Sequence, residues 1–333
     1  MKILVVGGAG YIGSHMAGVL LDAGHEIVTL DNLSSGFRDA ILGGEFVFGD
    51  LRDRQWLDSV FAAHRFDGVM HFASFIQVGE SMSHPSKYYQ NNVANTVNLL
   101  DAMVKHGVMR LIFSSTAAIF GEPGYVPIDE EHPRIPRNPY GRSKWMVEQI
   151  LSDYERAYGM RHTCLRYFNA AGADPSGKLG ERHEPETHLI PLALRAASGR
   201  GAAIKVFGAD YDTPDGTCIR DYIHVTDLCN AHLLALQRLM DGGRSRAYNL
   251  GNGNGFSVKE VIDAARKVSG RNIAVTEGPR REGDPARLVA DSKRAQTELG
   301  WRPRYPDLDT IITHAWAWEM RTANVPLARV AAG

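Results

Sequence analysis

Apolar positions in the first half of the chain alternate between two patterns. Short runs of β-branched and aliphatic residues, typical of buried strands, occur at 3–6, 26–30, 45–48, 68–72, 110–114 and 162–166. Apolar residues at helical spacing predict helices after the first run as far as residue 24, and at 54–63, 85–106 and 140–158. Strands and helices in this order form a parallel sheet with both faces covered. The pattern therefore predicts an α/β fold with a doubly wound parallel sheet.

The regular alternation ends near residue 169. The following stretch, residues 170–191, is rich in Gly, Pro and polar residues and predicts a long excursion. Shorter elements come next: strands near 204–207, 247–250 and 273–275, and helices at 226–240, 258–269, 292–299 and 308–319. We therefore expect a first domain at 1–169 and a smaller mixed α/β lobe at 170–333, with part of 219–250 returning to the first domain.

A glycine turn follows the first predicted strand, with Gly7, Gly10 and Gly13 at three-residue spacing before the first helix. A dinucleotide pyrophosphate must approach the backbone closely there, and the free N–H groups and dipole of the helix amino end bind the anion. The second strand is followed by Asp31, whose carboxylate can accept hydrogen bonds from both ribose hydroxyls and would repel the extra phosphate of NADP. Strand, glycine turn, helix and acid together predict a Rossmann-type domain that binds NAD.

Composition excludes several other classes of protein. The 333 residues carry a net charge of −1, which leaves no electrostatic footprint for nucleic acid or an anionic membrane. No apolar run approaches the length of a membrane span, and the strand expected at the first residues leaves no room for a signal peptide. Three cysteines without metal-ligand spacing suit reduced thiols, so we expect a cytoplasmic protein without a metal site.

The predicted helix that begins at Tyr140 carries the candidate chemistry. Tyr140 and Lys144 are four residues apart and so project from the same helix face. A phenol is a poor base near its usual pKa of about 10, but the positive charges of a lysine and an oxidised nicotinamide favour the phenolate. Thr116, at the end of the fifth strand, offers a hydroxyl that can share a proton with a substrate alcohol. The set predicts proton transfer to an alcohol oxygen during hydride exchange with NAD.

These residues resemble those of the extended short-chain dehydrogenase/reductases, through the sequence Gly-Gly-Ala-Gly-Tyr-Ile-Gly at 7–13, Thr116 and the Tyr-x-x-x-Lys pair. Within them, further segments resemble the UDP-glucose 4-epimerases. They are Asp31-Asn-Leu33, His71-Phe-Ala73, Val78-Gly-Glu-Ser81, Tyr89-Gln-Asn-Asn92, Leu165-Arg-Tyr-Phe-Asn169, Val206-Phe-Gly-Ala-Asp-Tyr211, Asp215-Gly-Thr-Cys-Ile-Arg-Asp-Tyr222 and Arg280-Arg-Glu-Gly-Asp284. The resemblance runs nearly end to end, and it implies a homodimer.

The resemblance also implies which residues line each ligand. The set implied for NAD is Gly7, Gly10, Tyr11, Ile12, Gly13, Asp31, Asn32, Leu33, Ser34, Ser35, Gly36, Asp50, Leu51, Phe72, Ala73, Ser74, Ile76, Asn91, Thr116, Tyr140, Lys144 and Phe168. The set implied for a UDP-sugar is Thr116, Tyr140, Asn169, His188, Leu189, Phe207, Arg220, Tyr222, Arg281 and Asp284. Chemistry agrees with the second set, because a diphosphate is bound by cationic forks such as those of Arg220 and Arg281.

The implied reaction is the interconversion of UDP-glucose and UDP-galactose. The C4 hydrogen of a hexose is not acidic, so inversion requires oxidation to a 4-keto sugar, rotation of that sugar and return of the hydride to its other face. Four positions depart from the best-known pattern: Thr116 replaces a common serine, Ile76 a lysine of some members, His188 a frequent asparagine and Leu288 a large tyrosine. Because leucine is smaller than tyrosine, UDP-N-acetylglucosamine stays open as a substrate.

Other proteins share this scaffold and differ from the chain at specific positions. UDP-glucuronate decarboxylases tend to carry a glutamate near the threonine, and this chain has none there. A 4,6-dehydratase usually has Asp-Glu after the threonine, whereas Thr116 is followed by Ala117 and Ala118. Epimerases of UDP-xylose or UDP-glucuronate stay open, because the contacts to C5 cannot be identified from the sequence. A non-catalytic NAD-binding regulator typically loses the tyrosine and lysine pair, which this chain keeps.

Overall fold

The computed structural model describes residues 1–281 and 284–323. The last ten residues of the predicted second lobe lie outside the described residues, as do Glu282 and Gly283 of the motif from Arg280 to Asp284. No helix in the described part of the chain is both long and apolar enough to cross a membrane.

A parallel sheet of seven strands is the largest element of the structure, in the order β11-β6-β5-β4-β1-β2-β3. Its strands are β1 (Lys2–Val6), β2 (Glu26–Asp31), β3 (Glu45–Phe48), β4 (Gly68–His71), β5 (Arg110–Thr116), β6 (Arg161–Tyr167) and β11 (Arg246–Leu250). Every neighbouring pair is parallel. The α/β prediction with a doubly wound parallel sheet is therefore confirmed.

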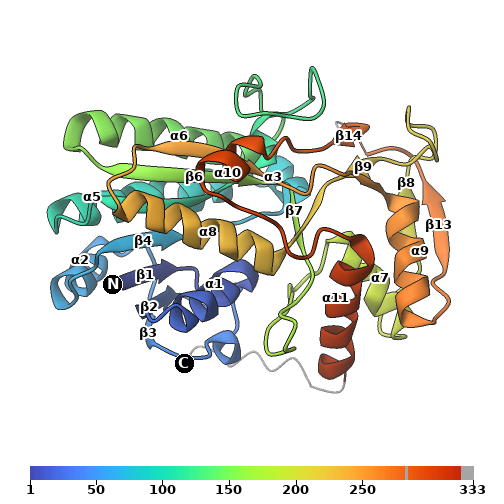
Figure 1. Cartoon of the computed structure of the whole chain (residues 1–333), viewed down its shortest axis with the longest axis horizontal. Helices are drawn as coiled ribbons and strands as arrows, with labels where there is room; N and C mark the ends of the chain where they lie inside the picture. The colour runs from blue at the N-terminus through green and yellow to red at the C-terminus, as the bar shows by residue number, and fades with distance from the viewer. Residues whose placement is uncertain (282–283, 324–333) are drawn as a thin grey trace.

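Helices cover both faces of this sheet, because successive strand residues point to opposite sides. Ile3 and Val5 pack with α1 (Tyr11–Asp22) and α8 (Val225–Met240). Leu4 and Val6 belong to the other core cluster, with α2 (Arg54–Ala63), α5 (Asn95–Lys105) and α6 (Pro139–Tyr158). Figure 1 shows α5 and α6 on one side of the sheet and α1 and α8 on the other.

The rest of the chain forms short strands beside the carboxyl ends of the large sheet. They are β7 (Asn169–Ala171) with β10 (Tyr222–His224), β8 (Ile204–Phe207) with β13 (Val275–Gly278), and β9 (Ile219–Arg220) between β12 (Phe256–Ser257) and β14 (Arg287–Leu288). Three helices pack together around the third large core cluster: α7 (Leu189–Ala197), α9 (Val258–Ser269) and α11 (Leu308–Thr322). The small helix α10 (Lys293–Glu298) packs near β11. The segment from α8 to β11 runs back along the large sheet.

Several local predictions differ from the structure. The single helix expected at 85–106 is instead α4 (Pro85–Tyr88), a π-helical stretch at Tyr89–Ala94 and α5. The sequence did not predict α3 (Val78–Ser83), which at six residues is too short for a visible period, or α7, whose Pro191 resembles a loop residue. Proline is tolerated there because the first turn of a helix has no internal partner for its N–H. The strand expected near 273–275 lies at Val275–Gly278.

Candidate active site

The glycine turn between β1 and α1 is shaped so that no side chain fills it. Gly7 has a positive φ of 79°, and a Cβ there would lie 2.5 Å from the backbone nitrogen of Ala73. A Cβ on Gly13 would lie 2.2 Å from the carbonyl oxygen of Gly7. Gly10 is the N-cap of α1 and brings no side-chain cap to the first turn. The amino end of α1 is therefore open to a phosphate group, and the turn fits the pyrophosphate of a dinucleotide.

Asp31, at the end of β2, is buried beside this turn. Its carboxylate accepts hydrogen bonds from the backbone nitrogens of Ala9 (2.9 Å) and Leu33 (2.8 Å). Burial raises the pKa of the carboxyl, and these backbone hydrogen bonds oppose the rise. The next turn continues the network, since the Asn32 amide donates to Asp50 at 2.7 Å. Asp31 and Asp50 thus lie on one rim with the glycine turn, although backbone groups already use part of the Asp31 acceptor capacity.

The segment after β4 completes this side of the site. The backbone nitrogens of Phe72 and Ala73 both donate to the Val6 carbonyl oxygen, at 2.8 and 3.1 Å, which holds Ala73 against Gly7. Asn92, which the sequence analysis named in a family segment but placed in neither ligand set, fixes the following loop. Its buried amide accepts from the Phe75 nitrogen (2.9 Å) and donates to the Ser143 hydroxyl (3.1 Å). Asn92 was difficult to recognise because it lies in the π-helical stretch, where helical spacing does not indicate which residues face the site.

The catalytic candidates meet where α6 crosses the end of β5. The Asn138 side chain caps α6 by accepting from the Gly141 nitrogen at 2.8 Å. Gly141 permits a close approach, because a Cβ there would lie 2.4 Å from the Ala118 carbonyl oxygen. The Lys144 ammonium donates to the Ser114 carbonyl oxygen at 2.7 Å. Tyr140, Lys144 and Thr116 are all buried, with 9%, 4% and 7% of their surface exposed. The structure therefore brings the three residues together at one strand end.

Burial also sets the proton affinities of these groups. It lowers the pKa of Lys144 to about 7, against the opposing attraction of Glu148. It raises the pKa of Tyr140, and the Thr116 side chain opposes that rise. Positive charge close to the phenol is therefore required before Tyr140 can act as a base near neutral pH. An oxidised nicotinamide and a protonated Lys144 are the two sources of such charge.

Glu148, one turn beyond Lys144, forms a buried ion pair that the sequence analysis missed. It accepts from the Arg166 guanidinium at 2.6 Å and from the Ser115 hydroxyl at 2.6 Å. Only 4% of the Arg166 side chain and 5% of the Glu148 side chain are exposed. Tyr140, Lys144 and Glu148 share a spacing of four residues, which is the signal that could have revealed Glu148. The pair ties α6 to β5 and β6 directly behind the catalytic candidates.

Four of the residues expected at the UDP-sugar meet at the short strands. Arg220 pairs with Asp284, the Asp284 nitrogen donates to the Arg281 carbonyl oxygen (3.3 Å), and the Arg281 guanidinium lies 4.1 Å from the centre of the Phe207 ring. These residues come from β9, the end of β8 and the segment before β14. The structure thus joins two cations and an aromatic ring from distant parts of the chain.

The other members of that set lie elsewhere. The Asn169 amide donates to the Asp221 carbonyl oxygen at 3.0 Å, and Tyr222 is buried in the core formed by α7, α9 and α11. His188 precedes α7, and its Nδ1 lies 2.7 Å from Glu181. Leu189 begins α7 and is partly buried against the same core as Tyr222.

The sequence is similar to those of known proteins. Residues 3–251 match the model of the NAD dependent epimerase/dehydratase family. The chain is 53% identical to the UDP-glucose 4-epimerase of Halalkalibacterium halodurans, over 96% of this chain and 95% of the relative. It is 52% identical to that of Rhizobium meliloti, over 96% of this chain and 97% of the relative.

Solved structures of UDP-glucose 4-epimerases also resemble the structure of this chain. That of UDP-glucose 4-epimerase from Brucella ovis in complex with NAD matches with a TM-score of 0.93 and 49% identity, over 95% of this chain and 97% of that one. That from Bifidobacterium longum in complex with NAD+ and UDP has a TM-score of 0.93 and 39% identity, over 97% and 99%. The chain belongs to the NAD dependent epimerase/dehydratase family.

Proposed function

We propose that the protein is a UDP-glucose 4-epimerase, which interconverts UDP-glucose and UDP-galactose through a 4-keto sugar while NAD stays bound. The observation that carries the proposal is the buried group of Tyr140, Lys144 and Thr116 at the end of β5. It lies on the rim that also carries the glycine turn, as expected for a ligand beyond the carboxyl ends of parallel strands. The relatives named above, at about 50% identity over nearly the full chain, support the same activity.

NAD, when bound, supplies the hydride acceptor and the hydride donor. The turn at Gly7, Gly10 and Gly13 would hold its pyrophosphate and Asp31 its ribose hydroxyls. Tyr140 takes the proton of the sugar 4-hydroxyl and later returns it. Lys144 favours the phenolate through its positive charge, and Thr116 shares the proton at the sugar oxygen.

The second ligand set would hold UDP while the sugar turns over. Arg220 and Arg281 provide the positive charge that a diphosphate requires, and Phe207 provides an aromatic face. Binding energy from the nucleotide, which does not react, would keep the keto sugar in the site between the two hydride transfers. We retain residues 1–169 and 170–333 as the proposed NAD and UDP-sugar domains, with part of 219–250 in the first.

Proton NMR of UDP-galactose with the purified full chain, without added NAD, tests the proposal. We expect conversion to UDP-glucose, because the cofactor is regenerated in each cycle and retained. Tyr140→Phe is the control, and its spectrum should stay that of UDP-galactose. If the wild-type protein converts none of the sugar even with NAD supplied, the proposed function is wrong, and UDP-xylose and UDP-glucuronate become the next substrates to test.

Leu288 favours a second substrate. It lies in β14 beside Arg220 and is partly buried near Phe168 and Ala117. A leucine leaves more room there than a tyrosine, so we infer that UDP-N-acetylglucosamine is also epimerised. Leu288→Tyr should lower the rate with that sugar at least about tenfold relative to the rate with UDP-galactose, since one misfitting group costs roughly 1–3 kcal/mol. Equal losses with both sugars would contradict this role for Leu288.

A homodimer and a cytoplasmic location are also part of the proposal. The three cysteines are free and buried, which suits a reducing compartment. Sedimentation velocity would distinguish a dimer from a monomer, since it reports the mass of the particle in solution.

A further inference from the structure

The loop between β7 and α7 carries four side chains that converge on one point. They are Glu181, His183, Glu186 and His188, here called the 181–188 cluster. Each offers one ligand atom, and these four atoms lie within 4.8 Å of one another. They lie apart from Tyr140 and Lys144, on a segment that the sequence analysis treated as an irregular excursion and expected to bind no metal. His188 is also in the set that the resemblance implies for the UDP-sugar, so a role as metal ligand would replace that contact.

Two of the distances within the cluster are close to those between ligands of one small cation. His183 Nδ1 lies 3.3 Å from Glu181 Oε1 and 3.6 Å from Glu186 Oε2, and His188 Nδ1 lies 2.7 Å from Glu181 Oε1. In a tetrahedral zinc site with bonds of about 2.0–2.1 Å, two ligand atoms are separated by about 3.3 Å. The pairs at 3.3 and 3.6 Å are close to that separation, whereas the pair at 2.7 Å and any pair near the 4.8 Å limit need side-chain shifts to reach it.

Burial and missing hydrogen bonds give a second, independent reason to expect a ligand. The side chains of Glu181 and Glu186 are 6% and 1% exposed. Glu186 Oε2 and His183 Nδ1 are both buried and have no hydrogen-bond partner among the described residues, and the two atoms lie 3.6 Å apart. A buried carboxylate oxygen left in this way is costly unless a proton or a cation satisfies it.

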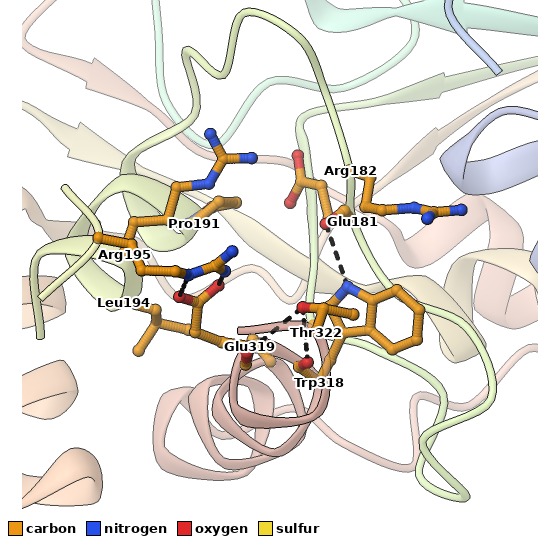
Figure 2. A pocket seen from close by; sticks show the side chains of 11 residues that line it. Glu181, Arg182, Pro191, Leu194, Arg195, Trp318, Glu319 and Thr322 are labelled. Atoms are coloured by element: carbon orange, nitrogen blue, oxygen red, sulfur yellow. Dashed lines mark hydrogen bonds and ion pairs between the residues drawn. The ribbon is translucent and has the colours of Figure 1, made fainter. Parts of the chain in front are cut away.

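Backbone hydrogen bonds fix the orientation of the Glu186 carboxylate. Glu186 Oε1 accepts from the nitrogens of Thr187 (2.8 Å) and His188 (2.9 Å), which leaves Oε2, 3.6 Å from His183 Nδ1, as the oxygen without a hydrogen bond. Arg195 also approaches that oxygen, but only to 3.9 Å. Figure 2 shows the Glu181 carboxylate turned away from Trp318, whose indole donates to the Glu181 carbonyl oxygen at 3.3 Å.

We propose that the 181–188 cluster is a structural site for a divalent transition-metal ion, with zinc the best fit. Two imidazoles and two carboxylates suit zinc, whereas calcium and magnesium prefer oxygen ligands alone. The two carboxylates balance the charge of the ion, and four protein ligands close the site, which is typical of structural rather than catalytic zinc.

Such an ion would fix a loop that touches the glycine turn. The Tyr11 hydroxyl donates to the Gly172 carbonyl oxygen at 2.8 Å, and Arg182 pairs with Asp39. Arg182 also lies 4.0 Å from the centre of the Phe37 ring. The ion would therefore hold the loop against the start of α1. A slower loss of NAD would follow, and this consequence rests on the proposed function, whereas metal binding itself does not.

The test measures metal on the full-length protein, purified without a histidine tag. Elemental analysis should find about one zinc per chain after dialysis against a small excess of zinc. After removal of zinc by a chelator, cobalt(II) should give the intense visible bands of tetrahedral coordination. His183→Gln and Glu186→Gln should each weaken metal binding at least about tenfold, because each removes one ligand. The exposed His84 provides the control His84→Gln, which should bind metal like the wild type.

Two results would overturn the proposal. One is a wild-type protein that binds neither zinc nor cobalt, in which case protons alone balance the two carboxylates. The other is metal content unchanged in both ligand variants. If a variant fails to fold, the cobalt spectrum of the wild-type protein still tests the proposal, because that measurement requires no variant. Because the readouts are metal content and absorption, their failure is distinguishable from failure of the epimerase assay.

Discussion

The two sides of the proposed site rest on different kinds of support. The side that carries Tyr140 and Lys144 is built on a seven-stranded sheet with two apolar cores and the buried Glu148–Arg166 pair. The side that carries Arg220 and Arg281 is built on strands of two to four residues, joined by ion pairs and ring contacts. The reaction requires both a precisely positioned proton acceptor and a site that keeps the nucleotide bound while the sugar rotates. We call the side with Tyr140 and Lys144 the rigid side, and the side with Arg220 and Arg281 the adaptable side.

Removing the phenol tests the rigid side and should have the largest effect. Tyr140→Phe keeps the ring but removes the proton acceptor, so turnover of UDP-galactose should fall about 10²–10⁴-fold. NAD measured by absorbance after denaturation should stay at the wild-type level, because the phenol is not needed to hold the pyrophosphate. An active phenylalanine variant would show that another group accepts the proton.

Removing a cation tests the adaptable side. Arg220→Ala should raise the KM for UDP-galactose roughly 10–100-fold, since a charge-assisted hydrogen bond is worth about 1.5–3 kcal/mol, and should affect kcat less. Arg280 is the matched control, because it pairs with Asp210 on the surface and Arg280→Ala should leave KM unchanged. Equal effects of the two variants would mean that Arg220 does not contact the diphosphate.

Asp221 connects the short strands and allows a test by stability. Its buried carboxylate accepts from the backbone nitrogens of Asn252 (2.7 Å), Gly253 (3.0 Å) and Ala290 (3.1 Å). Asp221→Asn places an NH₂ group against at least one of these donors. The free energy of unfolding, measured in urea, should fall by about 1–3 kcal/mol.

The same substitution at an exposed helix cap should hardly change the free energy of unfolding. Asp307 caps α11 at the surface by accepting from the Thr310 nitrogen at 2.7 Å. Asparagine caps helices about as well as aspartate, so Asp307→Asn should change the free energy of unfolding by a few tenths of a kcal/mol. If both variants have the same small effect, Asp221 does not hold the short strands together.

The pH dependence of stability at His232 tests how completely water is excluded from the core on the rigid side. Burial between α8 and the sheet lowers its pKa to about 4, whereas an unfolded histidine titrates near 6.5. Below pH 6.5 the unfolded chain takes up a proton that the folded protein refuses, so folding stability falls as the pH falls toward 4. The contribution is about 1.4 kcal/mol per pH unit. Urea titrations from pH 4.5 to 7.5 should show a shallower decline for His232→Gln, and an unchanged one for the control His84→Gln.

The sequence predicted the rigid side well because that side is periodic. Alternating strands and helices, the glycine spacing and the pair Tyr140 and Lys144 all follow short-range rules, and the fold class is confirmed. The adaptable side is different, because Arg220 and Asp284 meet only through long-range pairing of two-residue strands. No local pattern indicates such a meeting, and only the resemblance to known enzymes pointed to those residues. Glu148 and Asn92 were missed because their roles depend on partners from distant segments.

The place of β11 in the sheet has a consequence for how the chain is made. β6 is paired on one side by β5, and its other partner, β11, begins roughly 80 residues later in the chain. At about 5–20 residues per second, a ribosome needs on the order of 4–16 s to supply it. During that interval the nascent sheet ends in an unpaired strand, which is the kind of edge that other chains can join. We therefore expect nascent chains that end before residue 246, whose sheet ends in the seven-residue strand β6, to aggregate or to bind a chaperone more than chains that include β11, whose five-residue edge lies beside α10.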